Sequence, residues 1–358
     1  MVSRRSIFQL FPPVLALLLT LAATVCTAQN RPTPLSQILT GGSSLSAADL
    51  ATVKSYADYW TNVLKDSAAG PADVEAARVE LVRPLTNPAV SPAFRFEYSK
   101  LIEPELQKIV EGDNIHRAVN AVIVGSSLGS DRGANFLLLN INKLEQPKWQ
   151  IRLQAAYGCR MMLQAGVLES RKVLDAVKRL RDAAATEDHP IVLQHQLAAI
   201  GAAKASDEER KQVFAVLIES INATVGRVAE AKGDPTPMLA AVNSAVLMLR
   251  DKYMAMMKGS PDRKMIGQKL GPSLGQMLNV AATNWETAQR DDRSKRLYAA
   301  VVGGCQGFLT SIDEDARGGS PPDTKLQEAW NAGDKAKFNT QVAQWAAVLK
   351  MPPYTPQP

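Results

Sequence analysis

Cysteine and histidine are scarce in this sequence of 358 residues, which has three of each. Only Cys159 and Cys305 lie beyond the N-terminal apolar run, and two cysteines are too few for a disulfide framework. The histidines, His116, His189 and His195, form no H-E-x-x-H motif and no pair four residues apart. The sequence therefore predicts no catalytic residue, no metal site and no cofactor.

Long hydrophobic runs and strand patterns are also rare. The apolar run at residues 14–23 is shorter than the about 20 residues that a membrane-spanning helix needs, and no other run approaches that length. Only residues 121–124 and 136–139 allow an extended interpretation. These absences exclude a membrane span after removal of the N-terminus and favour an all-α fold.

The N-terminus has the three parts of a secretory signal peptide. Arg4 and Arg5 give a positive start, residues 14–23 give the apolar centre, and the small Ala28 precedes the predicted cleavage point. We therefore expect residues 1–28 to be removed on export, and the mature protein to be periplasmic or secreted in a bacterial envelope. The arginine pair is compatible with the general and the twin-arginine export pathways alike.

The charge balance is mildly basic. The full chain has 41 basic and 35 acidic residues, a formal net charge of +6, of which two positive charges leave with Arg4 and Arg5. This balance permits contact with an anionic envelope polymer without requiring it, and no nucleic-acid partner is expected for an exported chain.

What the sequence does contain is helical periodicity. Apolar residues recur at spacings of three and four from residue 46 onward, and Gly, Pro and Asp fall between these runs. The more regular predicted helices are 114–126, 134–144, 149–165, 169–185, 190–204, 207–231, 236–258, 273–289, 293–311, 323–331 and 335–350. The predicted organisation is a signal peptide (1–28), a flexible leader rich in Pro, Gly and Ser (29–45), a helical repeat domain (46–312), a linker (313–322), a C-terminal helical hairpin (323–350) and a disordered tail (351–358).

Three segments of the central region echo one another: each has a basic residue, then small alanines, and the second and third end on glycine. They align on Arg117, Arg152 and His195, which lie 35 and 43 residues apart, and a fourth copy follows at residues 296–303. This pattern resembles the second helix of HEAT-like repeats over residues 115–205. The resemblance implies an α-solenoid of stacked helical hairpins and an interaction role, and it names no active site.

Residues 125–129 match G-x-S-x-G, the turn that presents a serine nucleophile in hydrolases similar to the α/β-hydrolase fold. The preceding residues 121–124 would be the strand that this turn requires. The motif recurs at residues 271–275, where the proline indicates a helix boundary instead. Ser127 is therefore kept as a nucleophile only in an alternative hypothesis, since the sheet of that fold is missing.

Two basic stretches form the candidate binding surface. The residues of the candidate surface are Arg171, Lys172, Lys178, Arg179, Arg181, Lys252, Lys258, Arg263 and Lys264.

Methionine is concentrated in one region of the sequence. Seven of the eleven methionines lie between residues 238 and 277, a cluster that favours core filling or an adaptable groove over copper binding.

These observations predict a non-catalytic exported scaffold or adaptor that binds a protein partner on a helical-repeat surface. The first alternative is a binder of anionic envelope polymer through the basic helices. The second is a serine hydrolase that uses Ser127.

Overall fold

The computed structural model describes residues 32, 35–40, 44–318 and 320–354. In this part of the chain there are 15 α-helices and two short 3-10 helices, and no strand. The predicted all-α fold is confirmed. Residues 121–124 and 136–139, which also allowed an extended interpretation, lie within α5 and α6. The predicted signal peptide, residues 1–28, falls outside the described residues.

The helices follow one another with short connections. Their bounds are η1 Leu35–Gln37, α2 Ala47–Lys65, α3 Pro71–Val82, η2 Arg83–Thr86, α4 Pro92–Glu111, α5 Ile115–Ser127, α6 Asp131–Leu139, α7 Trp149–Ala165, α8 Ser170–Thr186, α9 Pro190–Ala202, α10 Asp207–Glu230, α11 Thr236–Ala255, α12 Pro261–Thr283, α13 Trp285–Arg290, α14 Asp292–Arg317, α15 Leu326–Asn331 and α16 Lys335–Val348.

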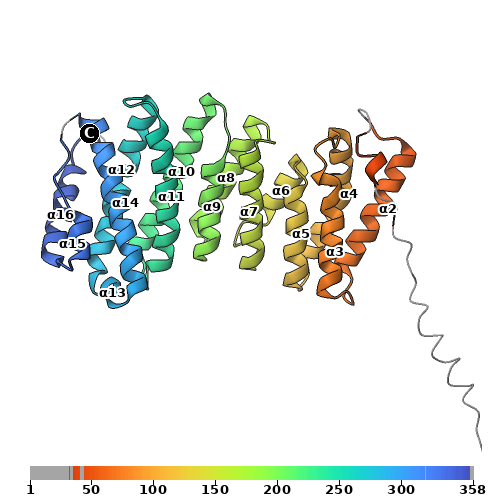
Figure 1. Cartoon of the computed structure of the whole chain (residues 1–358), viewed down its shortest axis with the longest axis horizontal. Helices are drawn as coiled ribbons and strands as arrows, with labels where there is room; N and C mark the ends of the chain where they lie inside the picture. The colour runs from red at the N-terminus through yellow and green to blue at the C-terminus, as the bar shows by residue number, and fades with distance from the viewer. Residues whose placement is uncertain (1–31, 33–34, 41–43, 319, 355–358) are drawn as a thin grey trace, which may run out of the picture.

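The helices pack as neighbouring pairs in two parallel layers, and the pairs stack into an elongated solenoid (Figure 1). The first layer runs α2, α4, α6, α8, α10, α12 and α16; the second runs α3, α5, α7, α9, α11, α14 and α15. Each of these 14 helices contacts a helix of the other layer and the next helix in its own layer. The short α13 packs on α14. The predicted stack of helical hairpins is therefore confirmed.

Local sequence signals set the ends of many helices. Ser46 and Asp49 form a reciprocal capping box at the start of α2, and Ser91 accepts a hydrogen bond from a backbone N–H at the start of α4. Gly166 ends α7 and Gly318 ends α14, both in the left-handed conformation that glycine tolerates best. These caps satisfy backbone groups that a helix leaves free at its ends.

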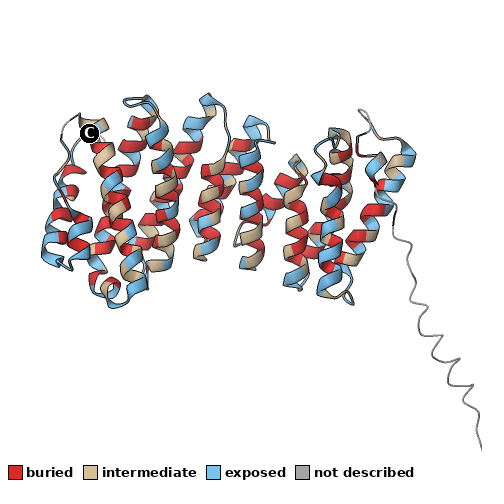
Figure 2. Cartoon of the chain, viewed as in Figure 1, coloured by how far each residue is buried: buried red, intermediate tan, exposed pale blue. Residues whose placement is uncertain are grey.

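The core lies between the two layers, where buried residues line the facing sides of the helices (Figure 2). In α7, Ala155 and Ala156 are fully buried together with Arg152. A Cβ added at Gly158 would lie 2.7 Å from the Cβ of Ser126, so α7 approaches α5 closely at this point. Small residues on α7 therefore permit the tight stacking that the sequence indicated.

The predicted linker at residues 313–322 is wrong in its first half. α14 continues to Arg317, and Asp313 is fully buried. The acidic run resembled a solvated loop because its carboxylates have partners distant in sequence: Arg263 lies 2.7 Å from Asp315. The C-terminal hairpin also belongs to the solenoid, since α15 packs on α14 and α16 packs on α12.

Parts of the predicted leader and tail are likewise packed. Leu35 and Leu39 are buried, and the Ser91 N–H donates to the Leu39 carbonyl at 2.8 Å. At the other end Tyr354 is buried, and its hydroxyl donates to Asp313 Oδ1 at 2.9 Å. Prolines and glycines alone indicated flexibility, whereas the few apolar residues among them bind to the ends of the stack.

One predicted helix boundary is wrong. The Gly-Pro-Ser at residues 271–273 lies inside α12, which is continuous from Pro261 to Thr283. A Cβ at Gly275 would lie 2.4 Å from Leu349, so this half of α12 is held closely against the C-terminal segment. Packing of this kind offsets the backbone hydrogen bond that an internal proline removes.

Candidate functional site

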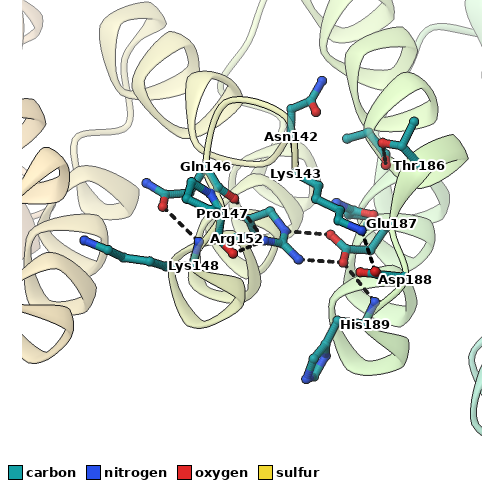
Figure 3. Close-up of polar contacts among 12 residues, drawn as sticks. Asn142, Lys143, Gln146, Pro147, Lys148, Arg152, Thr186, Glu187, Asp188 and His189 are labelled. Carbon is teal, nitrogen blue, oxygen red and sulfur yellow. Dashed lines mark hydrogen bonds and ion pairs between the residues drawn. The ribbon is translucent and has the colours of Figure 1, made fainter. Parts of the chain in front are cut away.

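The turns inside successive hairpins are tied together by buried and half-buried basic side chains. Arg152 on α7 forms two hydrogen bonds of 2.8 Å with the carboxylate of Glu187, which follows α8 (Figure 3). Its third nitrogen donates to the carbonyls of Gln146 and Pro147, at 2.9 and 2.8 Å. Both charged side chains are almost fully buried. A bidentate pair with this many partners fixes the position of α7 relative to the next hairpin.

The same edge continues to the neighbouring hairpins. Arg227 on α10 donates to the carbonyls of Ala184 and Glu187, at 2.9 and 3.1 Å. Arg117 on α5 donates to the carbonyl of Ser67 at 3.0 Å. These arginines bind backbone groups of adjacent turns, so they are part of the scaffold. Among the buried nitrogens of these three side chains, only the Nε atoms of Arg117 and Arg227 lack a partner.

A hollow lies beside this edge. It has a volume of about 630 Å³ and is lined by the ends of α4 and α6 and by residues 145–148. Lys148, its one cationic lining residue, donates to the carbonyl of Gly112. Gln146 Nε2 donates to Asn140 Oδ1 at 3.4 Å. The lining also carries the carboxylates of Glu111, Asp113 and Glu145, so the hollow is acidic, and its one cation is already bound to a backbone carbonyl.

The outer side of the second layer has a different character. Its four central helices, α5, α7, α9 and α11 up to Leu249, contain no aspartate or glutamate, and α9 contains no charged residue at all. Exposed apolar and aromatic side chains lie on this side, including Tyr157, Met161 and Ile191, which are 42%, 48% and 47% exposed. We call this surface the second-layer face. Its exposed and half-buried residues are Val119, Ile123, Tyr157, Arg160, Met161, Ile191, Gln194, His195, Ala198, Ser244 and Met248.

The second-layer face contains a small pocket of about 250 Å³ where α7, α9 and α11 meet. Gln194 Nε2 donates to Ser244 Oγ at 3.2 Å across this junction. The remaining lining residues are Arg160, His195, Ala198, Ala245 and Met248. The pocket therefore combines a positive group, two polar groups and an apolar wall.

His195 is the titratable group of α9 in this pocket. Burial lowers the pKa of His195 below its usual value of 6.5, and the positive charge of Arg160 lowers that pKa further. Its ring lies 6.0 Å from the ring of Tyr157 in an edge-on arrangement. At neutral pH the ring is uncharged, which keeps the second-layer face nearly free of charge.

The basic residues of the candidate binding surface fall on two separate parts of the molecule. Arg171, Lys172, Lys178, Arg179 and Arg181 lie on α8, whereas Lys252, Lys258, Arg263 and Lys264 lie at the junction of α11 and α12. α10 lies between α8 and α12 in the first layer, and its first turn carries Asp207, Glu208 and Glu209. The structure therefore does not bring the two basic stretches together.

Several of these cations are also paired within the chain. Lys172 forms an ion pair with Asp131, and Arg181 lies 2.9 Å from Asp182. Arg263 is buried, pairs with Asp315 and stacks over the ring of Tyr253 at 4.3 Å. Arg263 is thus a structural group at the joint of α11, α12 and α14, not a surface residue.

Ser127 does not lie in the surroundings that a nucleophile turn requires. It is the last residue of α5, and its hydroxyl donates to the Ile123 carbonyl at 3.2 Å. The predicted strand before it is helical, so the strand-turn-helix geometry is absent from this segment. The second copy of the motif, at residues 271–275, is helical throughout.

His189 and the two cysteines have structural surroundings, whereas His116 is exposed. The ring of His189 stacks on Trp149 at 4.2 Å, and its backbone N–H donates to Glu187 at 2.9 Å. Cys159 and Cys305 are buried free thiols, and burial raises the pKa of each to about 12. No group of three or more potential metal ligands occurs among the described residues. Nor does any helix in the described ranges have the length and apolar content to cross a membrane.

The sequence was compared with protein-family models and with curated proteins, and neither comparison gives a match.

The sequence analysis did not predict the second-layer face, because this surface has neither a motif nor a cluster of charge. The signal was an absence of acidic residues from α5, α7, α9 and the part of α11 up to Leu249. Counting acidic residues per predicted helix, and comparing alternate helices, would have found this face without a structure.

Proposed function

We propose that this protein is a non-catalytic exported scaffold that binds a protein partner on the second-layer face. The observation that supports the proposal is the exposure of Tyr157, Met161 and Ile191. These residues lie on α7 and α9, which are neighbours in the second layer and lack acidic residues. Depletion of charge together with exposed aromatic residues and methionine is typical of the centre of protein interfaces. A face that contacts only water is not expected to lack charge or to expose aromatic and methionine side chains.

The architecture supports the finer interpretation that the solenoid is HEAT-like. Arg117, Arg152 and His195, the residues on which the repeats align, lie on α5, α7 and α9 of the second layer. This is the layer in which the second helix of each hairpin stands. Repeat stacks of this kind use one extended face for binding, and here the second-layer face has the composition for it.

Export is part of the proposal and is tested by the mass of the mature protein. We expect the exported chain to begin at Gln29, because the small Ala28 precedes it after an apolar run. Intact-mass measurement of the protein recovered from the envelope or the medium decides this. A retained N-terminus, or a lipid on Cys26, would contradict it.

The binding proposal is tested by site-specific photo-crosslinking in the native envelope. A photo-reactive amino acid is placed at Tyr157 on the second-layer face and, as a matched control, at Asp175, an exposed residue of α8 in the first layer. We expect a discrete protein adduct from the position at Tyr157 and none from the position at Asp175. Adducts from Asp175 alone would overturn the proposal.

A pair of surface variants separates this proposal from polymer binding. Tyr157→Glu combined with Met161→Glu places charge on the second-layer face and should abolish partner capture. Arg171→Glu combined with Lys178→Glu reverses the charge of α8 and should leave capture unchanged. If only the α8 variant loses binding, and moderate salt elutes the ligand, then the binder of anionic polymer is the correct function.

A further inference from the structure

Arg160 has no partner that accounts for its position. It lies on α7, half-buried, and makes no hydrogen bond or ion pair within residues 44–318 and 320–354. The other two arginines of α5, α7 and α9 have acceptors: Arg117 binds carbonyls of the preceding turn, and Arg152 binds Glu187. The guanidinium nitrogens of Arg160 reach solvent, so they are free to bind an acceptor that a ligand supplies.

The surroundings of Arg160 offer it no acid. The four helices that make up the second-layer face contain no aspartate or glutamate up to Leu249. The pocket beside Arg160 does have a pre-arranged polar pair, since Ser244 Oγ accepts from Gln194 and donates to the Ala240 carbonyl at 3.1 Å. Ala198 and Met248 supply the apolar wall. The missing component is an anion attached to an apolar body.

We infer that the pocket between α7, α9 and α11 receives the side-chain carboxylate of an acidic residue in an otherwise apolar segment of the protein partner, with Arg160 as the anion-binding group. This inference rests on the proposed function. A guanidinium presents two parallel N–H donors that match a carboxylate, which gives geometric specificity as well as strength. An internal residue fits better than a chain end, because exposed side chains of the second-layer face continue beyond the pocket on both sides.

His195 makes the same pocket sensitive to pH. α7 presents Arg160 and Tyr157 to this ring, and α11 has no titratable residue before Arg250. α8 and α10, which also pack on α9, belong to the first layer and lie on its inner side. A bound carboxylate next to the ring favours the imidazolium and raises the pKa of His195. Acidification should therefore tighten carboxylate binding, since the protonated ring adds a second positive group.

The test uses three short peptide probes and the full mature chain labelled at its methionine methyl groups. The first probe has capped ends and a central glutamate between leucines; the second replaces the glutamate with glutamine. The third keeps the glutamine and has a free C-terminal carboxylate. Met248 lines the pocket, so its methyl resonance in NMR spectra reports binding.

We expect the glutamate probe to shift the Met248 resonance in a saturable manner, with an affinity at least about tenfold above that of either glutamine probe. Arg160→Gln should remove this tenfold advantage, and Arg171→Gln, an exposed arginine on α8, should leave it intact. The affinity for the glutamate probe should rise between about pH 7.5 and about pH 5.5, and this rise should be absent in His195→Gln.

Equal binding of the glutamate probe and its capped glutamine counterpart, or an unchanged affinity in Arg160→Gln, overturns the inference. Tight binding of the third probe alone also overturns it, because the pocket would then recognise a chain terminus. The result is separable from the photo-crosslinking. If the glutamate probe binds while no adduct forms at Tyr157, the carboxylate pocket stands and the scaffold function falls.

Discussion

The two helices of one hairpin, α8 and α9, differ more than any general property of the fold requires. α8 carries five basic residues and two acidic ones on its 17 residues, whereas α9 has no charged residue among its 13. Both helices bury an apolar side in the same core. The contrast therefore lies on their outer sides. Within the second layer, the lack of acidic residues is confined to α5, α7, α9 and α11 up to Leu249, since α3 and α14 are both charged.

This comparison shows that the outer sides of α8 and α9 differ in the groups that they present to solvent. A charged outer side keeps a helix soluble and needs no partner. An outer side with amides, hydroxyls, small residues and a few exposed aromatic side chains gains less from water and more from a covering surface. Variants can test how firmly the second-layer helices are held, how their stability responds to pH and whether the protein has a hydrolytic activity.

The largest effect is expected at the ion pair that fixes α7 against the next hairpin. Glu187→Ala leaves Arg152 buried with an uncompensated charge, because Arg152 is only 3% exposed. We expect the free energy of unfolding to fall by about 3–5 kcal/mol. Chemical denaturation of the purified variant measures this.

The matched control for this change lies at the same edge. Lys143→Ala removes the ion pair between Lys143 and Asp188, which is 40% and 66% exposed at its two side chains. It should cost less than about 1 kcal/mol. Similar losses in the two variants would mean that Arg152 finds other acceptors and does not fix α7 against the next hairpin.

A smaller loss is expected where the second-layer helices stack on one another. Ala156 is fully buried on α7, so Ala156→Leu forces three additional carbon atoms into a closed joint. We expect a destabilisation of about 1–3 kcal/mol, measured by thermal melting. Gln164→Leu adds leucine to an exposed position of the same helix and should be close to neutral. A neutral Ala156→Leu would show that the stacking is loose at this joint.

A weak pH effect should distinguish the two faces. Since the pKa of His195 is lower in the folded protein than its usual 6.5, the unfolded chain binds the proton more readily. Its contribution to stability is therefore complete above pH 6.5 and is lost as the pH falls through the folded pKa. Between about pH 7 and about pH 5, we expect the melting temperature of His195→Gln to fall less than that of the parent protein. An unchanged pH profile would show that His195 does not contribute to the pH dependence of stability.

The smallest effect is expected at Ser127. Ser127→Ala removes one hydroxyl that is bonded to the Ile123 carbonyl within the same helix. Thermal stability should change by no more than about 0.5 kcal/mol, and any hydrolytic activity of the protein should be retained. A general esterase assay and a fluorophosphonate label measure the second point. Loss of a hydrolytic activity in this variant would replace the scaffold proposal with the hydrolase.

Much of the fold was predictable because the signals that define it are local. The helix of Trp149–Ala165 was predicted with the bounds that the structure has, since apolar periodicity fixes its extent and Gly166 ends it. The interruption predicted at Pro272 was wrong for a reason that is not local. Leu349 and Tyr354 pack against that part of α12, from about eighty residues further along the chain.

The sequence by itself determined the helical class, most helix ends and the absence of acidic residues from α5, α7 and α9. Only the tertiary structure decided which charges are surface groups and which are structural: Arg263 and Asp315 resemble solvated residues in the sequence but are buried against each other. It also decided that Arg160 and His195 share one pocket with Ser244. The physical reason is that helix formation depends on neighbours within a few turns. Burial of a charge, by contrast, depends on a partner brought close only when the hairpins stack.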